Sequence, residues 1–207
     1  MLFTGITRTF STENEQQYET IGAFWAEMEC KYDCALLRGL GYNWTANTIE
    51  YVIGLTEGTI EDANCTVILP DEGWTEVRGR TEDLGRIYDG IYKDGALSYE
   101  IETFDAEGNC RILYSRSSEA FLKICRAGEE TEEEFCRETI LKMVTADGKI
   151  IGSVRAHKEN CTAFIGELTV QPDFRGHGLE SVLKSEIERC YKGSKIELFT
   201  GNRSNAI

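Results

Sequence analysis

A glycine-containing segment between two apolar stretches constrains this 207-residue chain most. Val170 is followed by Gln-Pro-Asp-Phe-Arg-Gly-His-Gly178, and the next apolar residues recur at helical spacing: Leu179, Val182, Leu183, Ile187 and Tyr191. Glycines at 176 and 178 let the backbone turn sharply and approach an anion, and a helix that follows directs its N-terminal partial positive charge at the same point. The segment predicts a strand, a phosphate-binding loop and a helix.

The residues around this segment predict a sheet. Strands are indicated over 139–146 and 150–157, joined by the tight turn Asp147-Gly-Lys149. A third strand covers 162–170, and a fourth is expected over 196–201 after the helix.

The pattern Val-x-Pro-x-x-Arg-Gly-x-Gly resembles motif A of the GNAT acetyltransferase superfamily. Supporting matches lie in Gly152–His157, Ile165–Val170 and Ile196–Gly201. The resemblance implies that residues 117–207 form a mixed-sheet acyl-CoA-binding domain whose cofactor is acetyl-CoA.

The resemblance also implies roles for individual residues. Backbone amides from Arg175 to Leu179 would hold the cofactor's pyrophosphate, and the main chain of Leu168, Thr169 and Val170 would bind the pantetheine arm like an added strand. The expected cofactor-binding loop residues are Arg175, Gly176, His177, Gly178, Leu179 and Glu180. Glu180 stands where the family places a very small residue. Glu167 is the candidate general base that takes a proton from an acceptor amine, and the alternative is a surface glutamate.

A full GNAT domain continues past the strand that ends at Gly201, whereas this sequence stops at Ile207. The resemblance therefore implies a domain without its C-terminal helix and strands. The alternatives are a fragment of a longer protein, a degenerate module, or a sheet completed by a second chain, as in a homodimer.

The first half alternates between helical and strand patterns. A strand is expected over 2–9 and a helix over 14–38, which Gly39-Leu-Gly41 would end. The later elements are strands over 49–55, 66–69 and 74–78, a helix over 84–91, and a strand pair over 98–104 and 111–115. The element order suggests a duplicated helix-and-sheet unit, so the whole chain is expected to be α+β.

Residues 2–116 resemble the GyrI-like, or AraC-type effector-binding, small-molecule-binding domain. The similarity lies in Ile21–Trp25, Ile49–Leu55, Val67–Val77 and Ser98–Phe104. It implies domains over 1–116 and 117–207, and a cleft in the first domain whose aromatic rings and carboxylate bind a cationic, lipophilic ligand.

The candidates for that cleft are Trp25, Tyr51, Trp74, Tyr99, Glu100 and Glu102. Glu100 and Glu102 share one side of a strand because side chains alternate with period two. Core packing is the alternative for each aromatic residue. Arg111 stands where such domains usually place an acidic residue at the start of the last strand.

The segment 117–137 is expected to form two short helical stretches, with Thr131 as the cap of the second and Glu129–Glu134 in and around its first turn.

Charge and composition limit the partners. The net charge is −14, and residues 1–116 hold 9 Lys and Arg against 21 Asp and Glu, or −12. A negative field disfavours nucleic acid. Eight scattered cysteines without paired spacing predict free thiols and no metal site. With no apolar run near the roughly 18 residues that span a bilayer, a cytoplasmic protein without a membrane partner is expected.

The leading hypothesis is acetyl transfer from acetyl-CoA to an amine of a small, cationic molecule, with a ligand-binding domain at the N-terminus. The alternative is a non-enzymatic binder or regulator of cationic lipophilic molecules. Hydrolysis of a reactive ligand by a carboxylate of the first domain is a third hypothesis.

Overall fold

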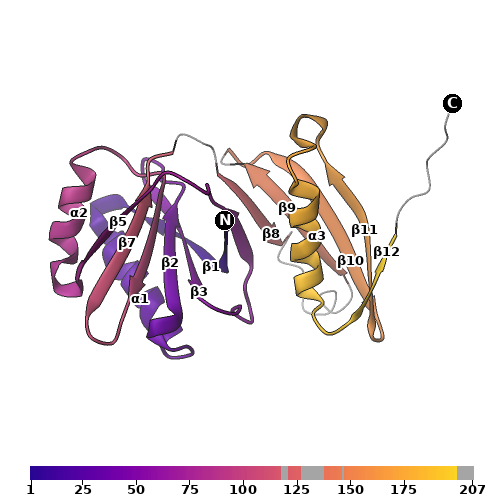
Figure 1. The fold of residues 1–207 in the computed structure, drawn as a ribbon, viewed down its shortest axis with the longest axis horizontal. Helices are drawn as coiled ribbons and strands as arrows, with labels where there is room; N and C mark the ends of the chain where they lie inside the picture. Colours follow the sequence, from indigo (N-terminus) through magenta and orange to yellow (C-terminus); the bar gives the residue numbers. More distant parts are fainter. Residues whose placement is uncertain (118–120, 127–137, 146, 200–207) are drawn as a thin grey trace. The chain divides into compact units, whose positions relative to one another are not determined.

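The computed structural model describes residues 1–117, 121–126, 138–145 and 147–199 (Figure 1). Its contacts divide the chain into two compact units, Met1–Phe121 and Leu122–Ile207. We refer to them as unit 1 and unit 2 and describe each by itself.

Unit 1 contains an antiparallel sheet of seven strands. The strand order is β4 (Cys65–Ile68), β1 (Leu2–Ser11), β3 (Thr48–Leu55), β2 (Leu37–Tyr42), β6 (Tyr99–Phe104), β7 (Asn109–Ser115) and β5 (Trp74–Arg80). The helices are α1 (Gln16–Glu29) and α2 (Leu84–Tyr92), with single 3-10 turns at Glu13–Glu15, Cys34–Leu36 and Thr81–Asp83.

The two faces of this sheet carry separate cores. On one face α1 contributes Phe24, Trp25 and Met28 to a cluster with β3, and α2 contributes Tyr88 and Ile91 to a cluster with β7. The alternating residues of the same strands form a cluster on the other face: Phe3, Leu40, Tyr42, Val52, Val67, Tyr99 and Ile101, with Trp74 and Leu113 packed against it. Each side chain of β6 therefore points either to the face that α1 and α2 cover or to the opposite face.

The helix predicted over 14–38 is shorter than expected. α1 ends at Glu29, and Leu37–Tyr42 form strand β2, so Gly39 and Gly41 do not end a helix. A Cβ on Gly39 would lie 2.0 Å from the Tyr51 hydroxyl, and one on Gly41 would lie 2.7 Å from Oε1 of Glu100. The two glycines are in the strand because neighbouring side chains occupy the space a Cβ would need.

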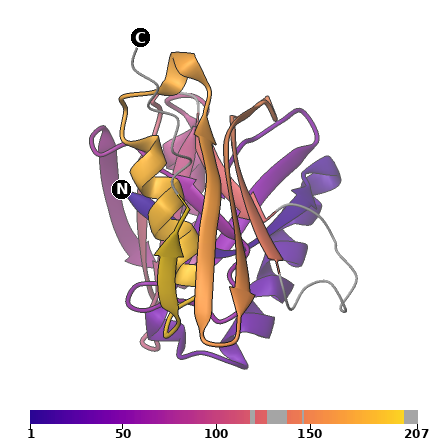
Figure 2. The ribbon, with the colours of Figure 1, turned by 90° about the vertical axis from the view of Figure 1, so that its right-hand side faces the viewer.

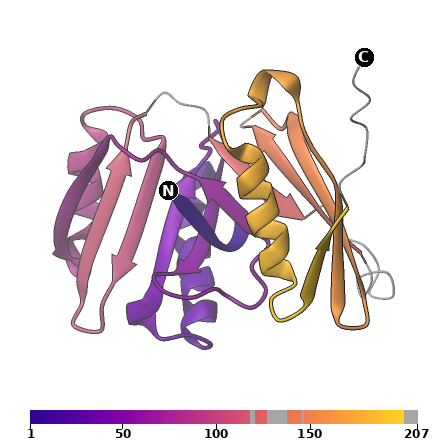
Figure 3. The same cartoon turned by 45° about the vertical axis from the view of Figure 1, so that its right-hand side comes forward.

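Unit 2 contains a mixed sheet with one helix on it (Figure 2 and Figure 3). The strand order is β12 (Lys195–Leu198), β11 (Thr162–Val170), β10 (Ile150–Glu159), β9 (Glu138–Thr145) and β8 (Leu122–Arg126). The helix is α3 (Leu179–Cys190), and Pro172–Phe174 form a 3-10 turn before it. β12 runs parallel to β11, and the other pairs are antiparallel. This is the mixed sheet expected for this half of the chain.

The segment after residue 117 differs from the expectation where the structure describes it. Leu122–Arg126 form strand β8, paired with β9, and not a helix. The pairing satisfies the backbone of a five-residue segment too short to be a stable helix alone. The expected cap Thr131 and the acidic run Glu129–Glu134 lie outside the described residues.

None of the helices formed by the described residues has the length and apolar character needed to cross a bilayer.

Candidate functional site

The loop between β11 and α3 has the conformation that its glycines predict. Gly176 and Gly178 have φ of 80° and 77°, in the left-handed region that favours glycine. Gly178 is the N-cap of α3, and no side chain caps the helix. The first amide of the helix with a backbone partner is that of Ser181, which donates to the Gly178 carbonyl at 3.0 Å.

Within the part of the chain that the structure describes, the five amides from Gly176 to Glu180 donate to no carbonyl or side chain. They lie where the positive end of the α3 dipole is concentrated. Three of these residues are exposed glycine or histidine, so the amides are open to an incoming anion. The loop therefore has the donors that a pyrophosphate requires.

Hydrogen bonds from Arg175 and Gln171 hold this loop to the sheet. Arg175 Nε donates to the Val170 carbonyl at 3.0 Å. The backbone amide of Gln171 donates to the Ile151 carbonyl at 2.7 Å, and its side-chain Nε2 donates to the Ile150 carbonyl at 2.5 Å. The Arg175 side chain thus fixes the loop to the end of β11, and the Arg175 backbone begins the turn.

The strand before the loop is irregular where the resemblance places a catalytic residue. Between Ser153 and Arg155 of β10 the register of β11 shifts, and Glu167 has φ of 52°. This is the geometry of a β-bulge, which bends a strand and redirects a side chain. The described pairing of β11 with β12 runs from Thr162 to Ile165, and the Phe199 amide donates to the Ile165 carbonyl at 2.8 Å.

A hollow of about 740 Å³ lies beside the bulge. It is lined by Arg155, His157, Phe164, Ile165, Gly166, Glu167, Leu168 and Phe199. The Glu167 side chain is 69% exposed at its rim, with Oε2 3.5 Å from Arg155 Nε. A carboxylate in this position is both a surface glutamate and a group that a substrate in the hollow could reach.

The other residues expected to bind the cofactor lie along the same strand and loop. Thr169 Oγ1 lies 3.2 Å from Ser153 Oγ, and Val170 is buried. His177 is exposed, and Glu180 is half-buried in the first turn of α3. A carboxylate in the first turn of a helix is favoured by the helix dipole. The hollow also includes His157, Phe164 and Phe199, which were not among the expected site residues.

Unit 1 contains a second candidate site, a cavity of about 710 Å³ on the face covered by α1 and α2. Its volume is in the range of small-molecule pockets. The aromatic residues that line it are Tyr18, Trp25, Trp44, Tyr51, Tyr88, Tyr92 and Phe104. Four carboxyl groups also line it, those of Glu29, Glu100, Glu102 and Asp105, and none of the described lining residues is Lys, Arg or His.

Glu102 is held by a chain of buried hydrogen bonds. Trp25 Nε1 donates to the Tyr51 hydroxyl at 2.9 Å, and that hydroxyl donates to Oε2 of Glu102. The Tyr88 hydroxyl donates to Oε1 of Glu102 at 2.5 Å. Burial and the Glu102 charge raise the pKa of Tyr51 and Tyr88 well above the ordinary value, so both hydroxyls remain donors.

Glu100 is equally buried but less well bonded. Its exposed fraction is 6%, against 7% for Glu102, and its Oε2 has no hydrogen-bond partner among the described residues. Burial, followed by repulsion from Glu102, raises the pKa of Glu100 well above its ordinary value. The nearby hydroxyls of Tyr88 and Tyr92 oppose part of this shift.

The structure brings together four of the six candidates of unit 1: Trp25, Tyr51, Glu100 and Glu102. Trp74 and Tyr99 do not line the cavity. Both pack into the cluster on the opposite face of the sheet, with ring centroids 6.1 Å apart. Tyr99 precedes Glu100 in β6, so alternation directs it to the other side.

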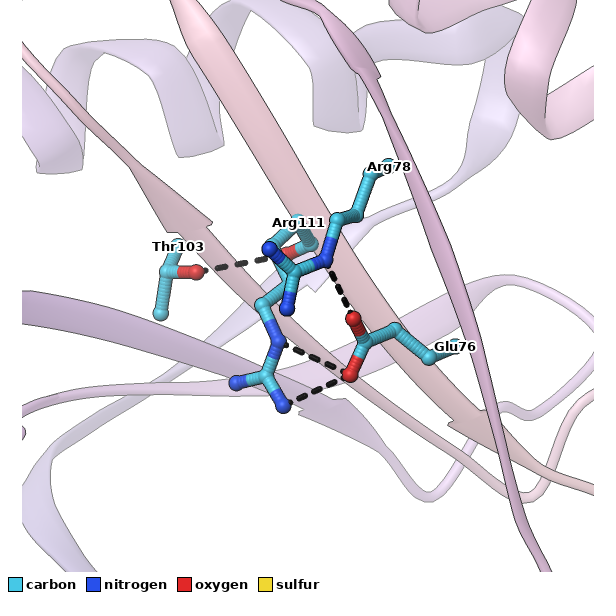
Figure 4. A network of polar contacts seen from close by, with 4 residues as sticks. All are labelled: Glu76, Arg78, Thr103 and Arg111. Atoms are coloured by element: carbon cyan, nitrogen blue, oxygen red, sulfur yellow. Dashed lines mark hydrogen bonds and ion pairs between the residues drawn. The ribbon is translucent and has the colours of Figure 1, made fainter.

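Arg111 does not line the cavity. Its Nε and Nη2 donate to Oε2 of Glu76 at 3.0 and 2.7 Å, and Arg78 donates to the other oxygen (Figure 4). These bonds lower the pKa of Glu76 to about 2. Ile112, the neighbour of Arg111 in β7, packs beneath α2, so Arg111 is directed to the opposite face. Two of the four carboxyl groups of the cavity, those of Glu100 and Glu102, come instead from β6.

Several lining residues of this cavity were missed by the sequence reasoning: Tyr18, Trp44, Tyr88, Tyr92 and Phe104. Tyr88 and Tyr92 were detectable, because an i, i+4 pair shares one helix face, and their rings are stacked with centroids 5.7 Å apart. Trp44 follows β2, a segment that the sequence analysis assigned to the end of a helix.

No group of three or more His, Cys, Asp or Glu side chains suited to a metal ion occurs among the described residues. The seven cysteines that the structure describes are free thiols.

Comparison with known proteins gives one family match. Residues 107–205 match the model of the Acetyltransferase (GNAT) family, a range that includes β11, the glycine loop and α3. No curated protein matches the chain in sequence.

Two solved structures have weak similarity to the chain. An acetyltransferase from Trypanosoma brucei is 22% identical, covers 35% of this chain and has a TM-score of 0.30. The chain spans 58% of that protein's length. An aminoglycoside acetyltransferase from an uncultured soil metagenomic sample, solved in complex with sisomicin, is 12% identical. The matched part covers 64% of this chain and 80% of that one, with a TM-score of 0.30. Because both scores are low, the family assignment rests on the sequence match of residues 107–205 to the GNAT acetyltransferase family.

Proposed function

We propose that unit 2 binds acetyl-CoA and transfers its acetyl group to an amine of a small, cationic molecule. The observation that carries this proposal is the set of five unpartnered amides, Gly176 to Glu180, at the N-terminus of α3. Members of the GNAT family generally use acetyl-CoA, whose anionic pyrophosphate oxygens can accept hydrogen bonds from these amides.

Each part of unit 2 would have a separate role in this reaction. The loop would hold the pyrophosphate, and the backbone of Leu168, Thr169 and Val170 in β11 would pair with the pantetheine arm. The thioester would then lie near the hollow beside the bulge. Glu167 would take a proton from the incoming ammonium group, because only a neutral amine can attack a thioester carbon.

Unit 1 would bind a cationic, partly apolar ligand in its 710 Å³ cavity. The support is the combination of aromatic walls with carboxyl groups and no basic lining residue among those described. Aromatic faces attract cations by about 0.5–2 kcal/mol per ring, and an unpartnered buried carboxyl group gains a partner when a cation binds. The cavity also supports the second candidate function, a binder or regulator of such molecules without catalysis.

Calorimetric titration of acetyl-CoA into the full chain tests the proposal for unit 2. We expect binding that Gly178→Glu weakens by more than about ten-fold, since a carboxylate beside the pyrophosphate repels it. Gly193→Glu is the matched control, because Gly193 has a similar φ of 89° and open space around it. It should leave binding unchanged. Absence of binding to the unsubstituted chain, or equal effects of both substitutions, would contradict the proposal.

A further inference from the structure

The cavity of unit 1 contains two carboxyl groups that cannot both carry a charge at low cost. Glu100 and Glu102 lie two residues apart on the same face of β6, and each is more than nine-tenths buried. Two like charges on one face of a strand repel when both groups are buried, so such a pair retains one proton more readily than two isolated carboxyl groups would.

The hydrogen bonds decide which group holds that proton. Glu102 accepts from Tyr51 and Tyr88, one donor on each oxygen, and donors favour the ionised form. Glu100 has an oxygen without any partner among the described residues. Glu102 is therefore the anion of the pair, and Glu100 holds the proton when the cavity is empty.

None of the described residues that line the cavity is basic. The titratable groups that face Glu100 are Glu102 on β6, Tyr51 on β3, Tyr88 and Tyr92 on α2, Tyr18 and Glu29 on α1, and Asp105 after β6. Every one is neutral or negative at neutral pH. A positive charge that pairs with an ionised Glu100 must therefore come from a group other than the described lining residues.

We propose that this cavity exchanges a proton for its ligand: an organic monocation with an aromatic or apolar body enters, Glu100 becomes ionised as its counter-ion, and the proton leaves to solvent. The inference rests on the proposed binding of cationic ligands in unit 1. For a quaternary ammonium ligand the step balances as one carboxylic acid plus one cation giving one carboxylate–cation pair plus one hydrogen ion. No covalent bond to the ligand forms or breaks.

The exchange has two consequences for the ligand. Protons compete with the cation, so affinity should rise about ten-fold per pH unit for as long as Glu100 is protonated in the empty cavity. Because only one carboxyl group changes its charge, the cavity is suited to one positive charge. A neutral molecule of the same shape would gain nothing from the ionisation.

The test is titration of benzyltrimethylammonium into the full chain by calorimetry near pH 6, in buffers with different ionisation enthalpies. The dependence of the observed heat on the buffer enthalpy gives the number of protons released. We expect about one proton per bound cation. Infrared spectra of the free protein should show the carbonyl stretching band of a protonated carboxyl group, which the cation removes and which Glu100→Gln lacks.

Matched variants separate the possible results. Glu61→Gln removes one exposed acid of unit 1 outside the cavity and should bind like the unsubstituted protein. Glu100→Gln should bind weakly, with no proton release and no dependence on pH. Binding of the cation without proton release would overturn the exchange and leave the ligand site standing. No binding of the cation by the unsubstituted protein would overturn the proposed ligand site, and the exchange with it.

Discussion

Glu100 makes the stability of the protein depend on pH, because a buried carboxyl group with a raised pKa binds a proton more tightly in the folded than in the unfolded chain. Its stabilising contribution is complete below its unfolded value of 4.5 and is lost as pH rises through the folded value. We expect Glu100→Gln to be more stable than the unsubstituted protein at pH 7–8, by roughly 1–3 kcal/mol, and to gain nothing near pH 4.

Urea unfolding of unit 1 at a series of pH values measures this difference, with Glu61→Gln as the control for simple loss of an acid. If the free energy of unfolding changes with pH in the same way for Glu100→Gln and for the unsubstituted protein, Glu100 has the same pKa in the folded and the unfolded chain. That result would contradict the prediction.

Glu167 is the residue on which catalysis by unit 2 depends in our proposal. Glu167→Gln should lower the rate of acetyl transfer by about 100-fold or more while acetyl-CoA binds as before, because a general base contributes to proton transfer and not to cofactor binding. The deficit should shrink as pH rises, since more of the acceptor amine is then already neutral. A deficit that is constant with pH, or a loss of acetyl-CoA binding, would assign Glu167 a structural role instead.

At the scale of elements, strand β2 leaves room for side chains of the unit 1 cavity because two of its residues have no side chain. A Cβ on Gly39 would lie 2.0 Å from the Tyr51 hydroxyl and 2.8 Å from the Trp25 ring, and both rings are fixed by packing. Gly39→Ala should therefore destabilise unit 1 by roughly 1–3 kcal/mol, as overpacking does. Gly90→Ala, in α2 with open space around it, should instead stabilise by about 0.5–1 kcal/mol. Urea unfolding measures whether each substitution lowers or raises the free energy of unfolding. If Gly39→Ala leaves it unchanged, the Tyr51 and Trp25 rings can move to make room.

The same strand shows what the sequence could and could not predict. Glycines have low strand propensity, so Gly39 and Gly41 indicated a helix end, whereas their reason is contact with Tyr51 and Glu100, which are distant in sequence. Glu100 and Glu102 were placed correctly on one face, because alternation is local. The sequence could not choose which face carries the cavity, and so the candidates included Trp74 and Tyr99, which lie on the opposite face. The β11–α3 loop was predicted well since its glycines and helix signal are contiguous.

At the scale of the whole molecule, the net charge of −14 acts oppositely on the two proposed ligands. Most of it, −12 from 9 basic and 21 acidic residues, belongs to residues 1–116, which include every residue lining the cavity. A cation approaching unit 1 is attracted over distances comparable to the Debye length, about 10 Å at 0.1 M salt, and acetyl-CoA, an anion, is repelled by the same field.

Raising salt from about 0.05 M to about 0.5 M should therefore slow the association of benzyltrimethylammonium by about ten-fold, at the low end of the range for electrostatic steering. The association rate of acetyl-CoA should not fall, because the repulsion is screened as well. Stopped-flow fluorescence of the tryptophans, of which Trp25 and Trp44 line the cavity, can follow the first reaction. A parallel fall in both rates would mean that the charges nearest each site, and not the field of the whole chain, control association.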